Sequence, residues 1–356
     1  MTGSIAMRQN NPFTLIFGAK PTMHIERPIQ FNIVKDTFLS VKPYTPTFLI
    51  TGVRGSGKTV FLTTINQYFA QLDDWIVVEL NPETNMVESL AAKIYQSSNM
   101  KFKFAKKEFS FSFHGVSFSI EGEKPISDAS SLLLEMLLYL EKKNKKILIS
   151  IDEISNTSQM KMFAHEFQML IRADLPVYLV MTGLYENVRN LQDENTLTFL
   201  YRLPTIQIES LDLIDITDSF EKVLNIKREF AIELAKLTNG YAYAYQVLGF
   251  ICYENDYKQL NDELLKEYDK YLRTYVYEKI WNDLPKKERE IVIAISNLKE
   301  RTTKKIMEEV NMNKFNFSQY RNRLVKKGIV YSPDWGELDF VLPRFSKYVL
   351  DIIAYQ

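Results

Sequence analysis

Between residues 47 and 215, short apolar runs alternate with longer segments in which apolar residues recur three and four positions apart. This alternation predicts parallel strands connected by helices that cover the sheet. Near-continuous runs such as Ile147–Ile149 indicate strands buried on both faces. The five predicted strands are Thr47–Gly52, Trp75–Asn81, Lys146–Asp152, Val177–Thr182 and Thr205–Glu209.

One segment departs from this pattern. Phe109–Phe113 and Val116–Ile120 alternate strictly between apolar and polar residues, and His114-Gly115 separates them as a turn signal. The pattern predicts a β-hairpin, at about residues 107–122, inserted between two helices. Packing on its own domain and contact with a partner both stay open as its function.

From about Leu211 to Lys299 the spacing is almost wholly helical, which predicts an all-helical domain. The remainder predicts helix, turn, helix and then a two-stranded wing, the order of a winged-helix domain. Its predicted elements are the helices Thr302–Val310 and Lys314–Lys327, a helix C-cap at Gly328, and the strands Ile329–Ser332 and Leu338–Val341. We therefore predict three domains, at residues 1–210, 211–283 and 284–356.

Composition narrows the class of protein. The 356 residues carry no net charge, so attraction to nucleic acid must come from a local patch. No apolar run approaches the roughly 20 residues of a membrane span, and the first ten residues have no signal-peptide core. A single cysteine, Cys252, cannot form an internal disulfide. We expect a cytoplasmic protein without a membrane partner.

The segment from Gly52 to Thr59 matches the P-loop pattern GxxxxGK[ST] at every fixed position. It follows a predicted strand and opens a predicted helix, the context this motif requires. Its glycines allow backbone angles at which successive N–H groups face phosphate oxygens. We predict that ATP binds Gly52, Val53, Arg54, Gly55, Ser56, Gly57, Lys58, Thr59 and Val60.

Lys58 would contact the β- and γ-phosphates, and the Thr59 hydroxyl would ligate Mg²⁺. A second motif lies about 95 residues downstream, where the apolar strand at residue 146 ends in Asp152-Glu153. Asp152 would hold the metal, and Glu153 would orient and deprotonate the attacking water. Because a protein that only bound nucleotide would not need Glu153, the pair favours ATP hydrolysis.

With five strands and a following helical lid, these motifs resemble the AAA+ class of P-loop ATPases, near the boundary of its initiator (origin-recognition) and STAND clades. The resemblance runs from Asn11-Pro-Phe to Phe340–Phe345. It implies an α/β core, a parallel sheet with helices on both faces, followed by a helical lid and a winged helix. It also places Arg27 beside the adenine and Thr182 at the sensor-1 position, and makes Arg202 an arginine finger that reaches a neighbouring subunit.

The lid departs from the AAA+ pattern. Where many members have a sensor-2 arginine, this chain has Gly240-Tyr-Ala-Tyr-Ala-Tyr-Gln246, and Ala242 replaces the proline common in STAND-like relatives. We interpret the three tyrosines as packing residues. Without the arginine, we expect slow turnover and a switch rather than a processive motor.

The C-terminal domain is locally basic. Residues 286–327 contain twelve Lys or Arg and five acidic residues, an excess of seven positive charges. Such segregated charge suits a phosphate backbone. We predict duplex-DNA contacts from Lys314, Asn316, Ser318, Gln319, Arg321, Arg323, Lys326 and Lys327. Phe315, Tyr320 and Leu324 are predicted to lie in the domain core.

Two functions stay open. In the first, ATP positions the winged helix on duplex DNA, as in replication, plasmid, phage or mobile-element proteins. In the second, the chain is a signalling or defence switch whose winged helix is an intramolecular or protein-binding module, and ATP drives self-assembly through Arg202. A metabolic kinase fits less well, because the lid and winged helix offer no evident place for a small phosphoryl acceptor.

Overall fold

The computed structural model describes residues 10–16, 21–97, 107–113, 116–120, 124–125, 129–194 and 197–355. The chain forms two compact units. One contains residues 28–51 and 61–207 and is called the sheet unit here. The other contains residues 1–27, 52–60 and 208–356 and is called the lid unit. No helix of the described part is long and apolar enough to cross a membrane.

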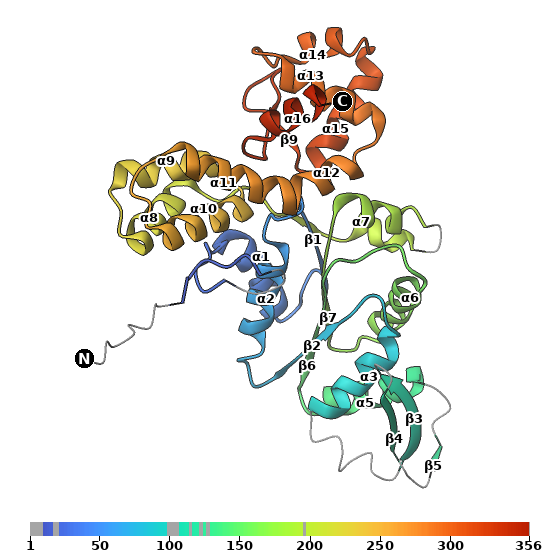
Figure 1. The fold of residues 1–356 in the computed structure, drawn as a ribbon. Helices are drawn as coiled ribbons and strands as arrows, with labels where there is room; N and C mark the ends of the chain where they lie inside the picture. Colours follow the sequence, from blue (N-terminus) through green and yellow to red (C-terminus); the bar gives the residue numbers. More distant parts are fainter. Residues whose placement is uncertain are drawn as a thin grey trace, which may run out of the picture. The chain divides into compact units, whose positions relative to one another are not determined.

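The sheet unit is built on five parallel strands in the order β2-β6-β7-β1-β8 (Figure 1). They are β1 (Thr47–Thr51), β2 (Trp75–Leu80), β6 (Lys146–Ile151), β7 (Val177–Gly183) and β8 (Thr205–Gln207). All five predicted strands are thus confirmed, with ends shifted by one or two residues. The parallel register pairs Thr51 at the end of β1 with Gly183 at the end of β7.

Helices cover both faces of this sheet (Figure 1). Since strand side chains alternate between faces, neighbours on β7 pack on different helices. Tyr178 lies with its ring centroid 4.9 Å from that of Phe38, on the face of α1 (Pro28–Leu39) and α2 (Lys58–Phe69). Leu179 belongs to the core formed with α3 (Met86–Ser97), α5 (Ala129–Glu141) and α6 (Ser158–Arg172). The predicted two-sided arrangement is confirmed.

The inserted hairpin is present between α3 and α5. Strands β3 (Lys107–Phe113) and β4 (Val116–Ile120) pair antiparallel, with Phe109 opposite Ile120. A two-residue strand, β5 (Lys124–Pro125), pairs parallel with β3. The predicted turn His114-Gly115 lies outside the described residues. After β7, α7 (Tyr185–Gln192) and the 3₁₀ helix η1 (Thr198–Arg202) lead to β8.

The lid is the helical part of the lid unit, followed by the winged helix. The lid comprises α8 (Leu213–Leu224), α9 (Arg228–Thr238), α10 (Ala242–Asn255), α11 (Asp262–Leu272), the π-helical turn η2 (Arg273–Tyr277) and α12 (Glu278–Asp283). The winged helix comprises α13 (Lys286–Asn297), α14 (Thr303–Glu309), α15 (Lys314–Lys326), β9 (Val330–Tyr331), β10 (Asp339–Phe340) and α16 (Phe345–Ala354). The predicted order of elements is confirmed.

Local signals fix the ends of α15. The Asn313 side chain accepts a hydrogen bond from the Asn316 N–H and caps the first turn. Gly328 follows the helix with φ +72°, a conformation that favours glycine, as predicted for a C-cap. The prediction that Phe315 is a core residue is wrong, because its side chain is 72% exposed. Phe317 is buried instead, since positions 317, 320 and 324 share one helical face and 315 does not.

The lid and the winged helix share one continuous hydrophobic cluster. Polar contacts add to it. The Asn239 amide donates to the carbonyls of Phe340 (2.9 Å) and Val341 (3.0 Å). The Arg344 guanidinium pairs with the Asp269 carboxylate of α11. Burial raises the pKa of Asp269, but hydrogen bonds from Arg344 and Lys347 outweigh it and lower the pKa. Folding of the winged helix is therefore tied to the lid.

A buried ion pair joins two helices of the winged helix. Lys327 Nζ lies 2.5 Å from Glu288 Oε2, and their side chains are only 8% and 1% exposed. Removing one member would leave the other charge buried without its partner, at a cost of about 3–5 kcal/mol. By contrast, Glu290 on the same helix pairs with Lys287 at the surface, where pairs contribute about 0–1 kcal/mol.

We predict that Glu288→Ala lowers the free energy of unfolding by about 3–5 kcal/mol and that Glu290→Ala changes it by less than about 1 kcal/mol. Denaturant unfolding followed by circular dichroism measures both. Replacing both members, as Glu288→Leu with Lys327→Met, should restore most of the loss, because no unpaired charge remains. Equal effects of the two single substitutions would contradict the prediction.

Candidate functional site

The P-loop connects the end of β1 to the start of α2 and adopts a closed, glycine-dependent turn. Gly55 and Gly57 have φ +77° and +95°, values that L side chains rarely adopt. The Ser56 N–H donates to the Val53 carbonyl (3.1 Å). Lys58 is 6% exposed, and its Nζ donates to the carbonyls of Gly52 and Val53, both at 3.1 Å. The lysine is thus positioned by the loop itself.

A buried polar atom of the loop is left without a hydrogen bond. Ser56 is 5% exposed, and its Oγ has no partner among the described residues. Buried hydroxyls without partners are uncommon and destabilising. Together with the backbone N–H groups of the loop, this hydroxyl is a suitable donor to an anion. The residues present therefore fit a phosphate-bearing ligand.

Arg27 lies beside the P-loop, a position that the sequence analysis did not predict. Its guanidinium donates to the Ser56 carbonyl (3.1 Å) and to the Glu209 carbonyl (2.7 Å). Burial lowers the pKa of Arg27 to about 10, and the Glu209 carboxylate partly opposes this shift. The side chain links the N-terminal segment, the P-loop and the residues that precede the lid. A contact with adenine stays a prediction.

The lid also holds the P-loop, by contacts that the sequence interpretation missed. The Tyr241 hydroxyl donates to the Arg54 carbonyl (2.5 Å), and the Tyr243 N–H donates to the Gly55 carbonyl (3.1 Å). A Cβ on Gly55 would lie 2.2 Å from the Tyr241 hydroxyl oxygen. Position 55 is one at which the P-loop motif allows any residue. A glycine at this position was therefore the one sequence feature that could have indicated a closely packed neighbour.

Asp152, Glu153 and Thr182 come together in the sheet unit. The Thr182 hydroxyl donates to Asp152 Oδ1, and the Glu153 N–H lies 3.1 Å from both Asp152 Oδ1 and Thr182 Oγ1. Thr182 is fully buried, whereas the Glu153 side chain is exposed. Glu153 has φ +54°, uncommon for a residue other than glycine, asparagine or aspartate. Strained backbone of this kind clusters at functional sites.

The metal assignment rests on residue chemistry, and the arginine-finger assignment rests on the family resemblance. The Thr59 hydroxyl and the Asp152 carboxylate are oxygen donors, which suit Mg²⁺ when phosphate oxygens and water complete the shell. No group of three His, Cys, Asp or Glu in the described part could hold a metal by itself. Arg202 is exposed at the end of η1, so its side chain is accessible.

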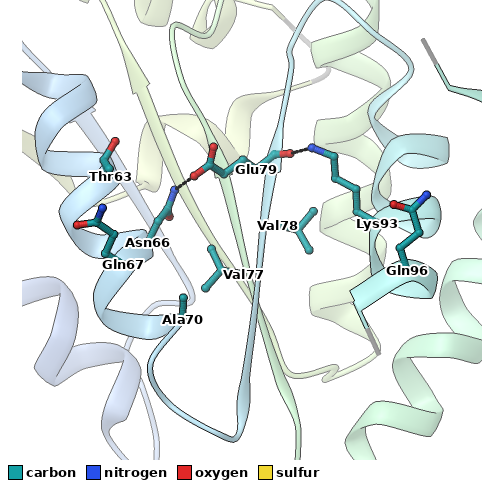
Figure 2. Close-up of a pocket in the computed structure, with 9 residues that line it drawn as sticks. All are labelled: Thr63, Asn66, Gln67, Ala70, Val77, Val78, Glu79, Lys93 and Gln96. Atoms are coloured by element: carbon teal, nitrogen blue, oxygen red, sulfur yellow. Dashed lines mark hydrogen bonds between the residues drawn. The ribbon is translucent and has the colours of Figure 1, made fainter. Parts of the chain in front are cut away.

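A cavity of about 640 Å³ lies along the outer edge of β2, and none of the predicted site residues lines it (Figure 2). Asn66 of α2 reaches across it to Glu79 Oε1 (2.8 Å) and also donates to Ser150 Oγ (2.9 Å). Lys93 of α3 donates to the Glu79 backbone carbonyl (2.6 Å), on the side of β2 that no described strand pairs with. We interpret these contacts as protection of an edge strand against pairing with another strand, and not as part of a catalytic site.

Most of the predicted DNA contacts lie on the accessible side of α15. Lys314, Asn316, Ser318, Gln319 and Lys326 are exposed. Arg321 is half-buried and donates to Ser332 Oγ (2.8 Å), and the Arg323 guanidinium lies 5.6 Å from the Tyr320 ring centroid. The prediction that Lys327 contacts DNA is wrong, because its side chain is buried in an ion pair with Glu288 and is not on this surface. Trp335, at the tip of the wing, is fully exposed.

Comparison of the chain with known proteins and solved structures identifies its fold. A family model described as "Domain of unknown function (DUF8462)" matches residues 274–349. No curated protein matches the chain. Among solved structures, the ORC2 protein of Aeropyrum pernix in ADPNP-ADP complexes aligns with a TM-score of 0.56 and 11% identity over 92% of each chain. The chain has the fold of this origin-recognition protein.

Two further structures align over nearly the whole length. The ADP form of the Aeropyrum pernix ORC2 protein has a TM-score of 0.50 and 12% identity, over 94% of this chain and 95% of that chain. The Cdc6p protein of Pyrobaculum aerophilum has a TM-score of 0.48 and 16% identity, over 95% of both chains. The fold implied by the sequence resemblance, an α/β core followed by a helical lid and a winged helix, is confirmed by the alignment with the ADPNP-ADP complexes of ORC2.

We predict that Gly55→Ala destabilises the protein more than Gly336→Ala, even without nucleotide. Both glycines have positive φ, +77° and +81°, so both substitutions introduce strain of about 1–2 kcal/mol. A Cβ at 336 would meet only Thr303 Oγ1 at 4.0 Å, whereas one at 55 would collide with Tyr241. Thermal unfolding compares them, and equal melting temperatures would refute the close contact.

Proposed function

We propose that this protein is an ATP-binding and ATP-hydrolysing AAA+ switch, with an ATPase core at residues 1–210, a lid at 211–283 and a winged helix at 284–356. The observation that carries this proposal is the formed P-loop, in which Lys58 is positioned by the carbonyls of Gly52 and Val53. The unpartnered buried Ser56 hydroxyl supports an anionic ligand. The Aeropyrum pernix ORC2 protein, which has this fold, is in complex with ADPNP and ADP.

Each residue has a proposed task. Lys58 would neutralise phosphate charge while the loop N–H groups donate hydrogen bonds, and Thr59 and Asp152 would hold Mg²⁺, which stabilises charge on phosphate oxygens. Glu153 orients the attacking water and accepts its proton. Thr182 fixes the Asp152 carboxylate and the Glu153 N–H, so it sets the direction of both groups. Arg202, exposed on η1, would reach the nucleotide of a second copy.

We predict that Glu153→Gln retains ATP but hydrolyses it roughly 10²–10⁴-fold more slowly, because the general base is removed while the P-loop is intact. Lys58→Ala should instead lose nucleotide affinity. Equilibrium binding of a fluorescent ATP analogue and phosphate release measure the two properties separately. Normal turnover by Glu153→Gln would refute its role, and ATP binding unaffected by Lys58→Ala would refute the site.

We further propose that α15 binds duplex DNA. Its accessible side presents Lys314, Asn316 and Gln319 without any acid, and α15 contains no acidic residue. Amide and ammonium groups of this kind can contact base edges and phosphates. In this function, nucleotide state at the P-loop would reposition the winged helix through the lid to which it is anchored by Asn239 and Asp269.

We predict that replacing Arg321, Arg323 and Lys326 with alanine weakens duplex-DNA binding and lowers the salt dependence of log Kd by roughly 2–3, about 0.9 for each phosphate that the protein then leaves unneutralised. A control replaces three exposed lysines of the lid, Lys236, Lys266 and Lys270, and so has the same net charge. Fluorescence anisotropy of labelled duplex at several salt concentrations gives the slopes.

Equal, weak binding by wild type and both triple variants would favour the second function, a signalling or defence switch. The close approach of Gly328 of the winged helix to Val53 of the P-loop supports this alternative. A Cβ added at Gly328 would lie 3.3 Å from Val53 Cβ. The winged helix then serves as an intramolecular module. ATP-dependent assembly without DNA, lost in Arg202→Ala, distinguishes this function from the first.

A further inference from the structure

The N-terminus of α10 packs on the P-loop because of the turn that precedes it. Gly240 has φ +72°, and its carbonyl accepts a hydrogen bond from the Leu211 N–H (2.7 Å) at the start of the lid. A Cβ at Gly240 would lie 2.6 Å from the Leu211 carbonyl oxygen, so this turn requires glycine. It fixes Tyr241, which is 2% exposed, directly ahead of α10.

The two contacts between α10 and the P-loop act on consecutive peptide units. Tyr241 holds the Arg54 carbonyl, and the Tyr243 N–H holds the Gly55 carbonyl. In a planar trans peptide the carbonyl and the following N–H point in opposite directions. Holding the Arg54 carbonyl toward the lid therefore turns the Gly55 N–H away from it. The two peptide units that flank Gly55 are therefore both held by the lid.

The other carbonyls of the loop have donors too. Lys58 bonds those of Gly52 and Val53, and Arg27 bonds that of Ser56. Tyr241 thus completes a set in which the carbonyls from 52 to 56 are all hydrogen-bonded. With these carbonyls engaged, the Gly55 N–H is directed away from the lid, as in an anion-binding nest, whereas the Ser56 N–H bonds the Val53 carbonyl.

Tyr241 differs from a cationic lid residue in chemistry. Its phenol is neutral, and burial raises its pKa well above the ordinary value, so it stays a donor over the physiological pH range. It bonds the loop rather than reaching toward the phosphates. Its effect should then be independent of whether the terminal phosphate is present.

We propose that Tyr241 is a positioning residue for phosphate binding: its hydroxyl orients the Arg54–Gly55 peptide so that the Gly55 N–H faces the phosphates shared by ADP and ATP. The lid of this chain thereby contributes to nucleotide affinity without an arginine. This inference rests on the proposed function, since it requires that the P-loop bind nucleotide.

Tyr241→Phe keeps the ring and removes the hydroxyl, and it has a matched control. Tyr245, on α10 one turn after Tyr241, is 1% exposed, and its hydroxyl pairs with Ser219 Oγ at 2.6 Å within the lid. Tyr245→Phe therefore also removes one buried hydroxyl and one hydrogen bond, but none to the P-loop. Both variants should fold, because the rings that fill the core are retained.

The experiment measures the dissociation constants of ADP and ATP for wild type and both variants. We expect Tyr241→Phe to weaken both nucleotides equally, by roughly 3–10-fold, as for the loss of one buried hydrogen bond. Tyr245→Phe should stay within about twofold of wild type. In nucleotide-free protein, hydrogen exchange of the P-loop peptide should be faster in Tyr241→Phe alone.

The outcomes separate the two proposals. Wild-type protein that binds neither nucleotide would overturn the proposed function itself. Wild-type binding with an unchanged or tighter affinity in Tyr241→Phe would overturn the positioning role only. Equal weakening in both tyrosine variants would overturn it as well, since it would indicate a general loosening of the lid. A loss confined to ATP would show a terminal-phosphate contact in place of the proposed one.

Discussion

A loop can offer its N–H groups to an anion only when its carbonyl groups are satisfied from the other side. Here that constraint draws together parts of the chain that are distant in sequence. Arg27 comes from the N-terminal segment, Lys58 from the loop's own helix, and Tyr241 and Tyr243 from the lid. The conformation of the P-loop is therefore a property of the whole lid unit and not of eight residues alone.

The hydrophobic pattern predicted the strands, the lid and the winged helix because burial on a sheet or a helix face imposes a period that the sequence must repeat. The pattern also placed Asp152 and Thr182 at strand ends, and the structure shows that these two strands are neighbours and that the two side chains are in contact. Periodicity failed for Phe315, which lies two positions from the buried Phe317 and so points away from the core.

Pairings between distant residues could not be predicted in the same way. In the sequence, the tyrosines of the lid look like ordinary packing residues of a buried helix. The turn at Gly240 is what brings Tyr241 to the Arg54 carbonyl, and the hydrophobic pattern does not reveal it. Lys327 ends a basic helix, yet Glu288, far away in sequence, buries it in an ion pair. A basic residue adds to the surface charge only if the fold does not bury it in an ion pair with an acidic residue.

The Lys93 ammonium group on the edge of β2 has a consequence for how copies of this chain can meet. It occupies the Glu79 carbonyl that an added strand would need, and Asn66 holds the Glu79 carboxylate in the same groove. In the described part of the chain, sheet-to-sheet growth from β2 is thus discouraged. Contacts between copies of this chain, where they form, would then use surfaces other than this strand edge.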